Sequence, residues 1–244
     1  MKSTRFLLSI TQIILMVSFT TMSFGCMNFP QDRGTSTNKI KEDRNVSNFS
    51  SLDVGGAFKV YLTQGNAEKL VVEADEDEIK DIVTEVVGGK LKIYMKSNWH
   101  GNVGEMSIYL TFKQLESIDF SGAVEVKSEN PLTFNDLDMD VSGAAEVTLN
   151  MSATKLDAEF SGASELEFTG TCQKGYIEIS GASEFEAENI VFTDLVIELS
   201  GASEARVNAT GELKIDASGA SSVRYKGGAK LTVDTSGASS VKEI

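Results

Sequence analysis

The tripeptide Ser-Gly-Ala recurs seven times in the second half of the chain, and this repeat constrains the fold more than any other feature. The copies begin at Ser121, Ser142, Ser161, Ser180, Ser200, Ser218 and Ser236. Successive copies lie 18 to 21 residues apart, with a mean spacing of about 19. Regular spacing of this kind is typical of proteins in which each repeat is one structural unit that packs only on its neighbours.

The residues around each motif alternate between apolar and polar, which indicates strands with one buried face. The positions one and three residues before each Ser, and five residues after it, are nearly all apolar. Those directly before the Ser are Phe120, Val141, Phe160, Ile179, Leu199, Ala217 and Thr235. Each repeat is therefore expected to form a strand, a tight Ser-Gly-Ala bend, a second strand and a second turn.

One such unit cannot bury its apolar face alone, whereas stacked units can. The sequence therefore predicts an all-β fold, a single-stranded parallel β-helix or solenoid of about 19-residue coils over residues 121–244. We expect the Gly of each motif to supply backbone freedom at the bend and the Ala to allow close packing inside it. A flat strip of small residues that binds a ligand is the alternative.

Residues 49–120 precede the repeats and are expected to form a diverged first coil and an N-terminal cap. In the segment 49–62, Gly55 takes the place of the motif Ser. Residues 82–94 indicate a β-hairpin around Gly88 and Gly89. The charged segment 75–81 is expected to form one or two helical turns, and the loop 97–104 holds Trp99 and His100. We treat 49–244 as one domain.

The first 25 residues have the pattern of a secretory signal: Lys2 and Arg5, an uncharged apolar stretch, then small residues before Cys26. A membrane-spanning helix is the alternative, but the stretch is at the short limit. The segment resembles a bacterial lipoprotein signal, which implies that Cys26 carries the lipid and that the protein is exported and anchored in the outer membrane. Residues 26–48 then comprise the lipid-anchor site and a polar tether.

Composition excludes several classes of function. The formal charge is −14, from 22 Lys and Arg against 36 Asp and Glu, so a general nucleic-acid binder is not expected. One His cannot build a His-rich metal site. No catalytic motif with a nucleophile elbow, phosphate loop or zinc-binding helix is present. Cys172 lies in a segment typical of a turn and is expected to be an unreactive small residue, with no disulfide framework.

Two columns of acidic residues accompany the repeats and are expected to face solvent. The first acidic row lies two residues before each motif Ser: Asp119, Asp140, Glu159, Glu178, Glu198, Asp216 and Asp234. The second acidic row lies four residues after it: Glu125, Glu146, Glu165, Glu184 and Glu204. Stacking would place like charges about 4.8 Å apart in each row, which is unfavourable.

Three roles are open for these rows. They are a solvated surface, or local hydrogen-bond acceptors for the hydroxyls and amides of the bend, or a binding site for Ca²⁺ or a cationic partner. No other cofactor is expected. Aromatic residues such as Trp99, Tyr94 and Tyr109 are candidates for stacking on sugars.

The order of motifs resembles the head GIN domain family. The resemblance is carried by FSSLDVGGAFKVYLTQGNAEKLVVEADEDEI, then EVVGGKLKIY, then the Ser-Gly-Ala repeats, and it covers about residues 49–244. It implies a β-solenoid lipoprotein of the cell envelope with an adhesin-like role and no catalytic residues.

We therefore expect a non-enzymatic envelope lipoprotein that acts as an adhesin-like binding or scaffold module, on the periplasmic or surface face of the outer membrane. The expected partner is an envelope glycan or protein. Alternatives are a structural lipoprotein without a specific ligand and a carbohydrate-active β-helix enzyme. An uncapped C-terminal coil would also favour a homo-oligomer, because its strand edges are unpaired.

Overall fold

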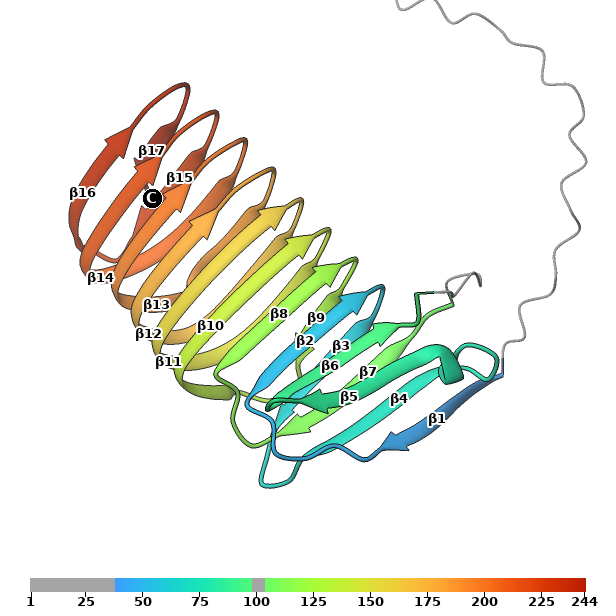
Figure 1. Cartoon of the computed structure of the whole chain (residues 1–244). Coiled ribbons are helices and arrows are strands. Elements are labelled where there is room, and N and C mark those ends of the chain that lie inside the picture. The colour runs from blue at the N-terminus through green and yellow to red at the C-terminus, as the bar shows by residue number, and fades with distance from the viewer. Residues whose placement is uncertain (1–37, 98–103) are drawn as a thin grey trace, which may run out of the picture. The chain divides into compact units, whose positions relative to one another are not determined.

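The computed structural model describes residues 38–97 and 104–244, and Ser36–Ile244 forms one compact unit. The expected fold class is confirmed: seventeen strands join in one continuous sheet that winds into a β-solenoid of about seven turns (Figure 1). A single turn of 3₁₀ helix, η1 (Ile79–Asp81), is the only helical element among the described residues. No helix in this part of the chain is long and apolar enough to span a membrane.

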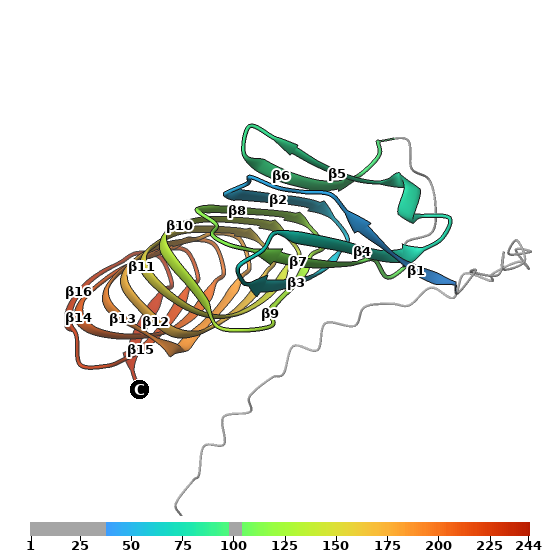
Figure 2. The same ribbon diagram turned by 90° about the horizontal axis from the view of Figure 1, so that it is seen from below.

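The repeats form parallel coils around one common axis (Figure 2). Their strands are β8 (Ser117–Gly122), β9 (Glu125–Ser128), β10 (Leu132–Gly143), β11 (Glu146–Gly162), β12 (Glu165–Ile179), β13 (Glu184–Leu199), β14 (Glu204–Ala217), β15 (Ser222–Lys226), β16 (Lys230–Thr235) and β17 (Ser240–Glu243). The register sets motif on motif, for example Ser121 beside Ser142 and Ser142 beside Ser161. The period of the sequence is therefore the period of the coil.

The second turn expected in each coil is absent from the middle of the solenoid. Strands β11 to β14 are 14 to 17 residues long and run from one Ser-Gly-Ala bend to the next. They curve instead of breaking, with local irregularities such as the register shift between Glu167 and Thr169. Each middle coil therefore has one sharp corner, which the motif forms.

The Gly of each motif is required for two reasons. Gly162 has a φ of 100°, a conformation that residues with a side chain rarely adopt. A Cβ built on Gly162 would lie 2.2 Å from the carbonyl oxygen of Gly143 in the preceding coil. The close approach lets the Ala163 amide donate to that same oxygen at 2.8 Å. The bends thus stack through backbone contact, which a side chain would prevent.

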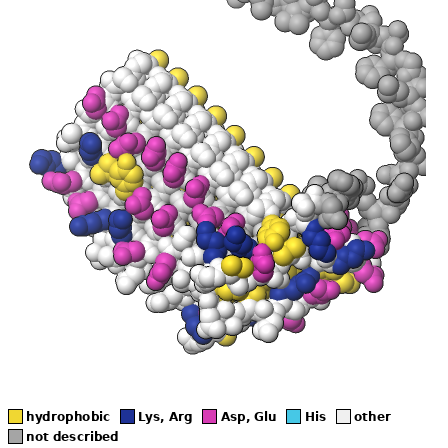
Figure 3. All heavy atoms as spheres, in the orientation of Figure 1, with side chains coloured by type: hydrophobic (Ala, Val, Ile, Leu, Met, Phe, Trp, Pro, Cys, Tyr) yellow, Lys and Arg dark blue, Asp and Glu magenta, His cyan; other side chains and the backbone are white. Residues whose placement is uncertain are grey.

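The expected role of the motif Ala is wrong. The alanines from Ala123 to Ala238 are exposed and form an outer edge along the solenoid, seen as a line of hydrophobic side chains in Figure 3. The residue after each Ala fills the inside of the bend instead, and in four coils it is a Ser that is at most 3% exposed. Ser221 Oγ, for example, donates to the carbonyl of Ser218 at 2.8 Å. The hydroxyls of Ser183 and Ser203 donate likewise to their own bends, whereas Ser164 Oγ donates to the carbonyl of Gly143 in the preceding coil.

The core of the coils is apolar, as the alternating pattern predicts. In the middle coils, the rings of Phe160, Phe168 and Phe185 meet with centroids 5.3 to 6.1 Å apart. Such aromatic pairs contribute about 0.5–1.5 kcal/mol each beyond their burial. Adjacent coils also match in size: Gly175 stands where other coils have Leu, and Phe192 lies against it. A bulky residue in one coil is accommodated by a small residue in its neighbour.

The cap, β1 to β7, closes the N-terminal end of the stack. Its strands are β1 (Lys39–Arg44), β2 (Ser51–Gly56), β3 (Lys59–Gln64), β4 (Lys69–Asp75), β5 (Ile82–Val87), β6 (Lys90–Met95) and β7 (Ser107–Phe112). Strands β2 and β3 form the first coil, in which Gly55 pairs with Ser121. Strands β6 and β7 lie over β2 and β3, and β6 joins β5 in the expected hairpin.

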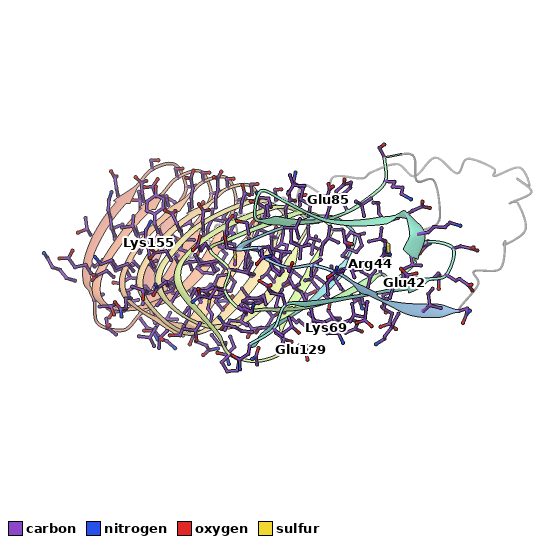
Figure 4. The ribbon with its side chains drawn as sticks, turned by 60° about the horizontal axis from the view of Figure 1, so that its bottom comes forward. Glu42, Arg44, Lys69, Glu85, Glu129 and Lys155 are labelled. Carbon is purple, nitrogen blue, oxygen red and sulfur yellow. The ribbon has the colours of Figure 1, made fainter. Side chains whose placement is uncertain are left out.

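The outer part of the cap is held by β1 and η1. Strand β1 pairs antiparallel with β4, which pairs antiparallel with β7. Arg44 donates to the carbonyl of Ile79 at 2.9 Å and lies 2.8 Å from the Glu42 carboxylate (Figure 4). Within the charged segment 75–81, expected to form one or two helical turns, the structure has the single 3₁₀ turn η1.

Cys172 is not in a turn. It lies inside β12 with its side chain buried, and burial raises the pKa of its thiol to about 11. Such a thiol is unreactive at neutral pH. The expectations for residues 1–37, including Cys26, and for Trp99 and His100 lie outside the described residues.

Candidate functional site

The first acidic row faces solvent along one wall of the solenoid. Its members are among the last residues of the strands that lead into each bend, so they lie beside the edge formed by the alanines. Figure 3 shows acidic side chains in a line parallel to that edge. The registers place Asp119 beside Asp140, Asp140 beside Glu159, and so on to Asp234, so each carboxylate has its like neighbour one coil away.

The first acidic row is neutralised only where it meets the cap. The Lys90 ammonium forms an ion pair with Asp119, and Lys92 occupies the row position opposite Asp53. From Asp140 onward, no member of the row has an ion pair among the residues that the structure describes. The row is therefore a strip of uncompensated negative charge, six carboxylates long. At the cap, Lys90 and Lys92 make the end of the row basic, and both residues lie in β6, outside the Ser-Gly-Ala repeats.

The second acidic row, on the wall after the bend, is compensated at its two ends. Glu125 pairs with Lys127 at 2.6 Å and with Lys59 at 3.6 Å. Glu204 lies 3.0 Å from Arg206 and 2.6 Å from Arg224. Only Glu146 and Glu165 have no ion pair within the described part of the chain, and Glu184 has a long one at 3.5 Å. The basic residues two positions after the acids, Lys127 and Arg206, thus pair with the second row, and the two rows differ in this respect.

The hydroxyls of the bend do not offset the charge of either row. Ser180 Oγ donates to the carbonyl of Phe160, and Ser218 Oγ donates to the carbonyl of Leu199. Among the described residues, no motif hydroxyl donates to a carboxylate of the rows. The role of local hydrogen-bond acceptor for these hydroxyls is therefore wrong. Repulsion is visible at Asp140, where burial, then the charges of Glu159, Asp119 and Asp138, raise the carboxyl pKa.

The row geometry does not build a metal site. Within residues 38–97 and 104–244, no three His, Cys, Asp or Glu side chains converge closely enough to hold a metal ion. Ca²⁺ takes six to eight oxygen ligands around one point, whereas a row spreads its carboxylates along a line.

The tyrosines of the described residues differ in whether their rings are accessible for stacking on a sugar. Tyr176, on β12 beside Glu178, is 37% exposed, and the charge of Glu198 is the main cause of its raised pKa. Tyr109 is not free to stack on a sugar, because Tyr61 stacks on its ring at 4.9 Å and Lys41 lies 4.6 Å from the ring centroid. Tyr94 is exposed at the cap and donates to Glu85. Sequence inspection did not single out Tyr176.

A shallow hollow of about 420 Å³ lies on the same wall as the first acidic row. Its charged lining includes Lys174, Asp194, Glu212, Lys214 and Lys230. Four of these form one column, six residues before the motif Ser, in which the acidic Asp194 and Glu212 lie between the basic Lys174 and Lys230. Glu212 and Lys230 pair at 3.6 Å. The hollow is open and its charges are mixed.

Comparison with known proteins gives one family and one shared fold. The model of the family described as "Putative auto-transporter adhesin, head GIN domain" matches residues 48–229. This description is that of an adhesin and not of an enzyme. No curated protein matches the chain.

Several crystal structures have a similar fold. A putative adhesin from Bacteroides fragilis NCTC 9343 is 24% identical with a TM-score of 0.79, and the match covers 86% of this chain and 98% of that one. A putative lipid binding protein from Parabacteroides distasonis ATCC 8503 is 23% identical with a TM-score of 0.63 over 86% and 98% of the two chains. A putative adhesin from Parabacteroides merdae ATCC 43184 is 14% identical with a TM-score of 0.68 over 86% and 97%.

Proposed function

Since this chain belongs to the head GIN domain family, we propose that it is a non-enzymatic, adhesin-like binding module of the cell envelope whose binding surface is the first acidic row. Membership of the family indicates a cell-envelope or exported protein. The observation that carries the proposal is the run of six carboxylates, Asp140 to Asp234, that have no ion pair among the described residues.

The chemistry of this surface selects a partner with repeated cationic groups. A row of carboxylates at a fixed spacing, on a rigid wall, attracts positive charge and favours a partner whose charges recur along its length. Protonated amino groups occur in amino sugars of glycans and in Lys side chains of proteins, so both kinds of envelope polymer offer them. Tyr176 adds an exposed ring beside the row. The proposal includes no resident metal and no nucleic acid.

Two probes separate the sources of those amino groups: a glucosamine hexamer with free amines, and hexalysine. Each is titrated calorimetrically into soluble residues 36–244, which form a compact unit. The row variant is Glu159→Gln, Glu178→Gln and Glu198→Gln. Its matched control is Glu146→Gln, Glu165→Gln and Glu184→Gln, which removes the same charge from the same part of the solenoid on the other wall.

We expect the row variant to weaken binding of the preferred probe about tenfold or more, and the control to weaken it much less. Preference for the hexamer assigns a glycan partner, and preference for hexalysine assigns a protein partner. Equal loss in the two variants, or no binding of either probe by the wild type, contradicts the proposal and favours a structural envelope protein without a specific ligand.

The proposed placement is at the outer membrane, through a lipid on Cys26. The expected tether 26–48 is too long at its C-terminal end, because Lys39–Arg44 forms β1, which pairs with β4 in the cap, so the proposed tether ends before β1. The support is the lipoprotein-like signal of residues 1–25 and the polar composition of the segment that follows. A Cys26→Ser change in the full-length chain, expressed in a bacterium with lipoprotein processing, tests it. We expect the wild type in the membrane fraction and the variant in the soluble fraction. Membrane retention of the variant contradicts the anchor.

A further inference from the structure

The last coil keeps the apolar pattern of the core, but none of the described residues packs on its outer side. Leu231 and Val233, on β16, are 38% and 40% exposed. In the coil before it, their register partners Leu213 and Ile215 are at most 1% exposed. Strand β16 pairs only with β14, and β17 only with β15, among the described residues. An apolar end face and two free strand edges therefore coincide (Figure 1).

The hydrogen bonds show which backbone groups are free. The Ser236 amide donates to Ala217 of the preceding coil at 2.9 Å. Because successive residues of a strand direct their N–H and C=O to opposite sides, Asp234, Thr232 and Lys230 also face the preceding coil. The N–H and C=O groups of Leu231, Val233 and Thr235 then face the free edge. Unpaired groups of this kind are a template for another strand.

We propose that the chain self-associates end to end, with β16 of one copy pairing antiparallel to β16 of a second copy about a two-fold axis at Thr232. In this register Leu231 faces Val233 of the second copy, so residues with free N–H and C=O groups face one another and form hydrogen-bonded pairs. Their side chains, both directed to the core side of the sheet, cover one another across the junction.

Charge complementarity selects a second copy as the occupant and fixes this register. Lys230 and Asp234 lie on the outer side of β16, two residues on either side of Thr232. Antiparallel pairing about Thr232 therefore sets Lys230 of each copy opposite Asp234 of the other, which gives two ion pairs per dimer. A register shifted by two residues would set Lys230 opposite Ser236 and lose both pairs.

Cysteine cross-linking of soluble residues 36–244 tests the register directly. In the proposed dimer, the two Thr232 residues form a non-hydrogen-bonded antiparallel pair with Cα atoms about 4.5 Å apart, within the range of a disulfide. We expect Thr232→Cys to form a covalent dimer on mild oxidation. Lys214→Cys is the matched control, because it occupies the same column one coil earlier and would lie about 14 Å from its counterpart.

Sedimentation velocity of the unmodified chain completes the test, with charge variants that keep the last coil intact. We expect a concentration-dependent dimer that weakens about tenfold in Lys230→Asp and in Asp234→Lys, and that recovers in the double exchange. If the chain stays monomeric up to about 200 µM, a concentration at which a dimer with a micromolar Kd would be largely formed, the proposal is overturned. A dimer in which Thr232→Cys does not cross-link, or in which Lys214→Cys does so equally, also overturns it.

Discussion

At the scale of single residues, the Gly of the motif carries the strictest requirement. Gly162 combines a positive φ with an approach of the preceding coil that leaves no room for a Cβ. We expect Gly162→Ala to lower the free energy of unfolding by about 1–3 kcal/mol or more, from strain and the displaced bend. Ala163→Ser, at the exposed neighbouring position, should change it by less than about 0.5 kcal/mol. Urea unfolding of the two variants measures both, and equal effects would contradict this account of the bend.

Asp140 shows the cost of burial, and then of like charges, in the first acidic row. Its folded pKa is raised, so the native protein holds this proton more tightly than the unfolded chain does. Stability therefore falls as the pH rises from the ordinary carboxyl pKa through the raised one, and at pH 7 the charged group is destabilising. Asp140→Asn should raise the melting temperature slightly at pH 7 and have a smaller effect near pH 3. Asp136→Asn, outside both rows, is the control; a loss of stability in Asp140→Asn at pH 7 would contradict the repulsion.

At the scale of the element, neighbouring coils are matched in side-chain volume. A Cβ on Gly175 would lie 2.7 Å from the Phe192 ring and 2.8 Å from Leu195. We expect Gly175→Ala to cost about 1–3 kcal/mol from overpacking. Combined with Phe192→Leu, its cost should fall, because the smaller side chain makes room. A double-mutant cycle of unfolding free energies measures the coupling; strictly additive effects would show that the two residues are not matched.

The strands were predictable from sequence, but the corner between them was not. Alternation of apolar and polar residues fixes which face of a strand is buried, as for Phe160 and Glu159. At the bend the alternation is interrupted, because Gly162 and Ala163 are both exposed before the buried Ser164. Composition alone does not show that interruption. The long strands β11 to β14 were missed for a related reason: a gradual curve needs no turn residue.

The sequence predicts the two columns of acidic residues. It does not predict that the first row has an ion pair only at Asp119, or that the second row is paired at both ends. The repeat fixes which residues share a column. Neutralisation depends on residues outside the column, such as Lys59 and Lys90 of the cap, which are far away in sequence. The proximity of Lys90 follows from the register between β2, β6 and β8, and that of Lys59 from the pairing of β3 with β9, neither of which the diverged first coil reveals.

At the scale of the whole molecule, the solenoid presents its charges along a line rather than around a point. We therefore expect Ca²⁺ and Mg²⁺ at equal concentration and fixed ionic strength to give melting temperatures that agree within about 1 °C, because either ion only screens the rows. Thermal melts of residues 36–244 with each ion, with EDTA, and with the variant Glu165→Gln and Glu184→Gln make the comparison. A rise specific to Ca²⁺ that the variant abolishes would establish a cation site in the second acidic row.

The central claim, that the first acidic row is the binding surface, is tested most directly by zero-length cross-linking. A carbodiimide joins the amines of a bound glucosamine hexamer or hexalysine to the carboxylates they touch, and peptide mass spectrometry identifies the sites. We predict cross-links at Asp140, Glu159, Glu178 and Glu198. Exposed acids outside the rows, Glu42 and Glu85 of the cap and Glu129 after β9, serve as internal controls (Figure 4). Cross-links distributed equally over the row and these controls would contradict the claim.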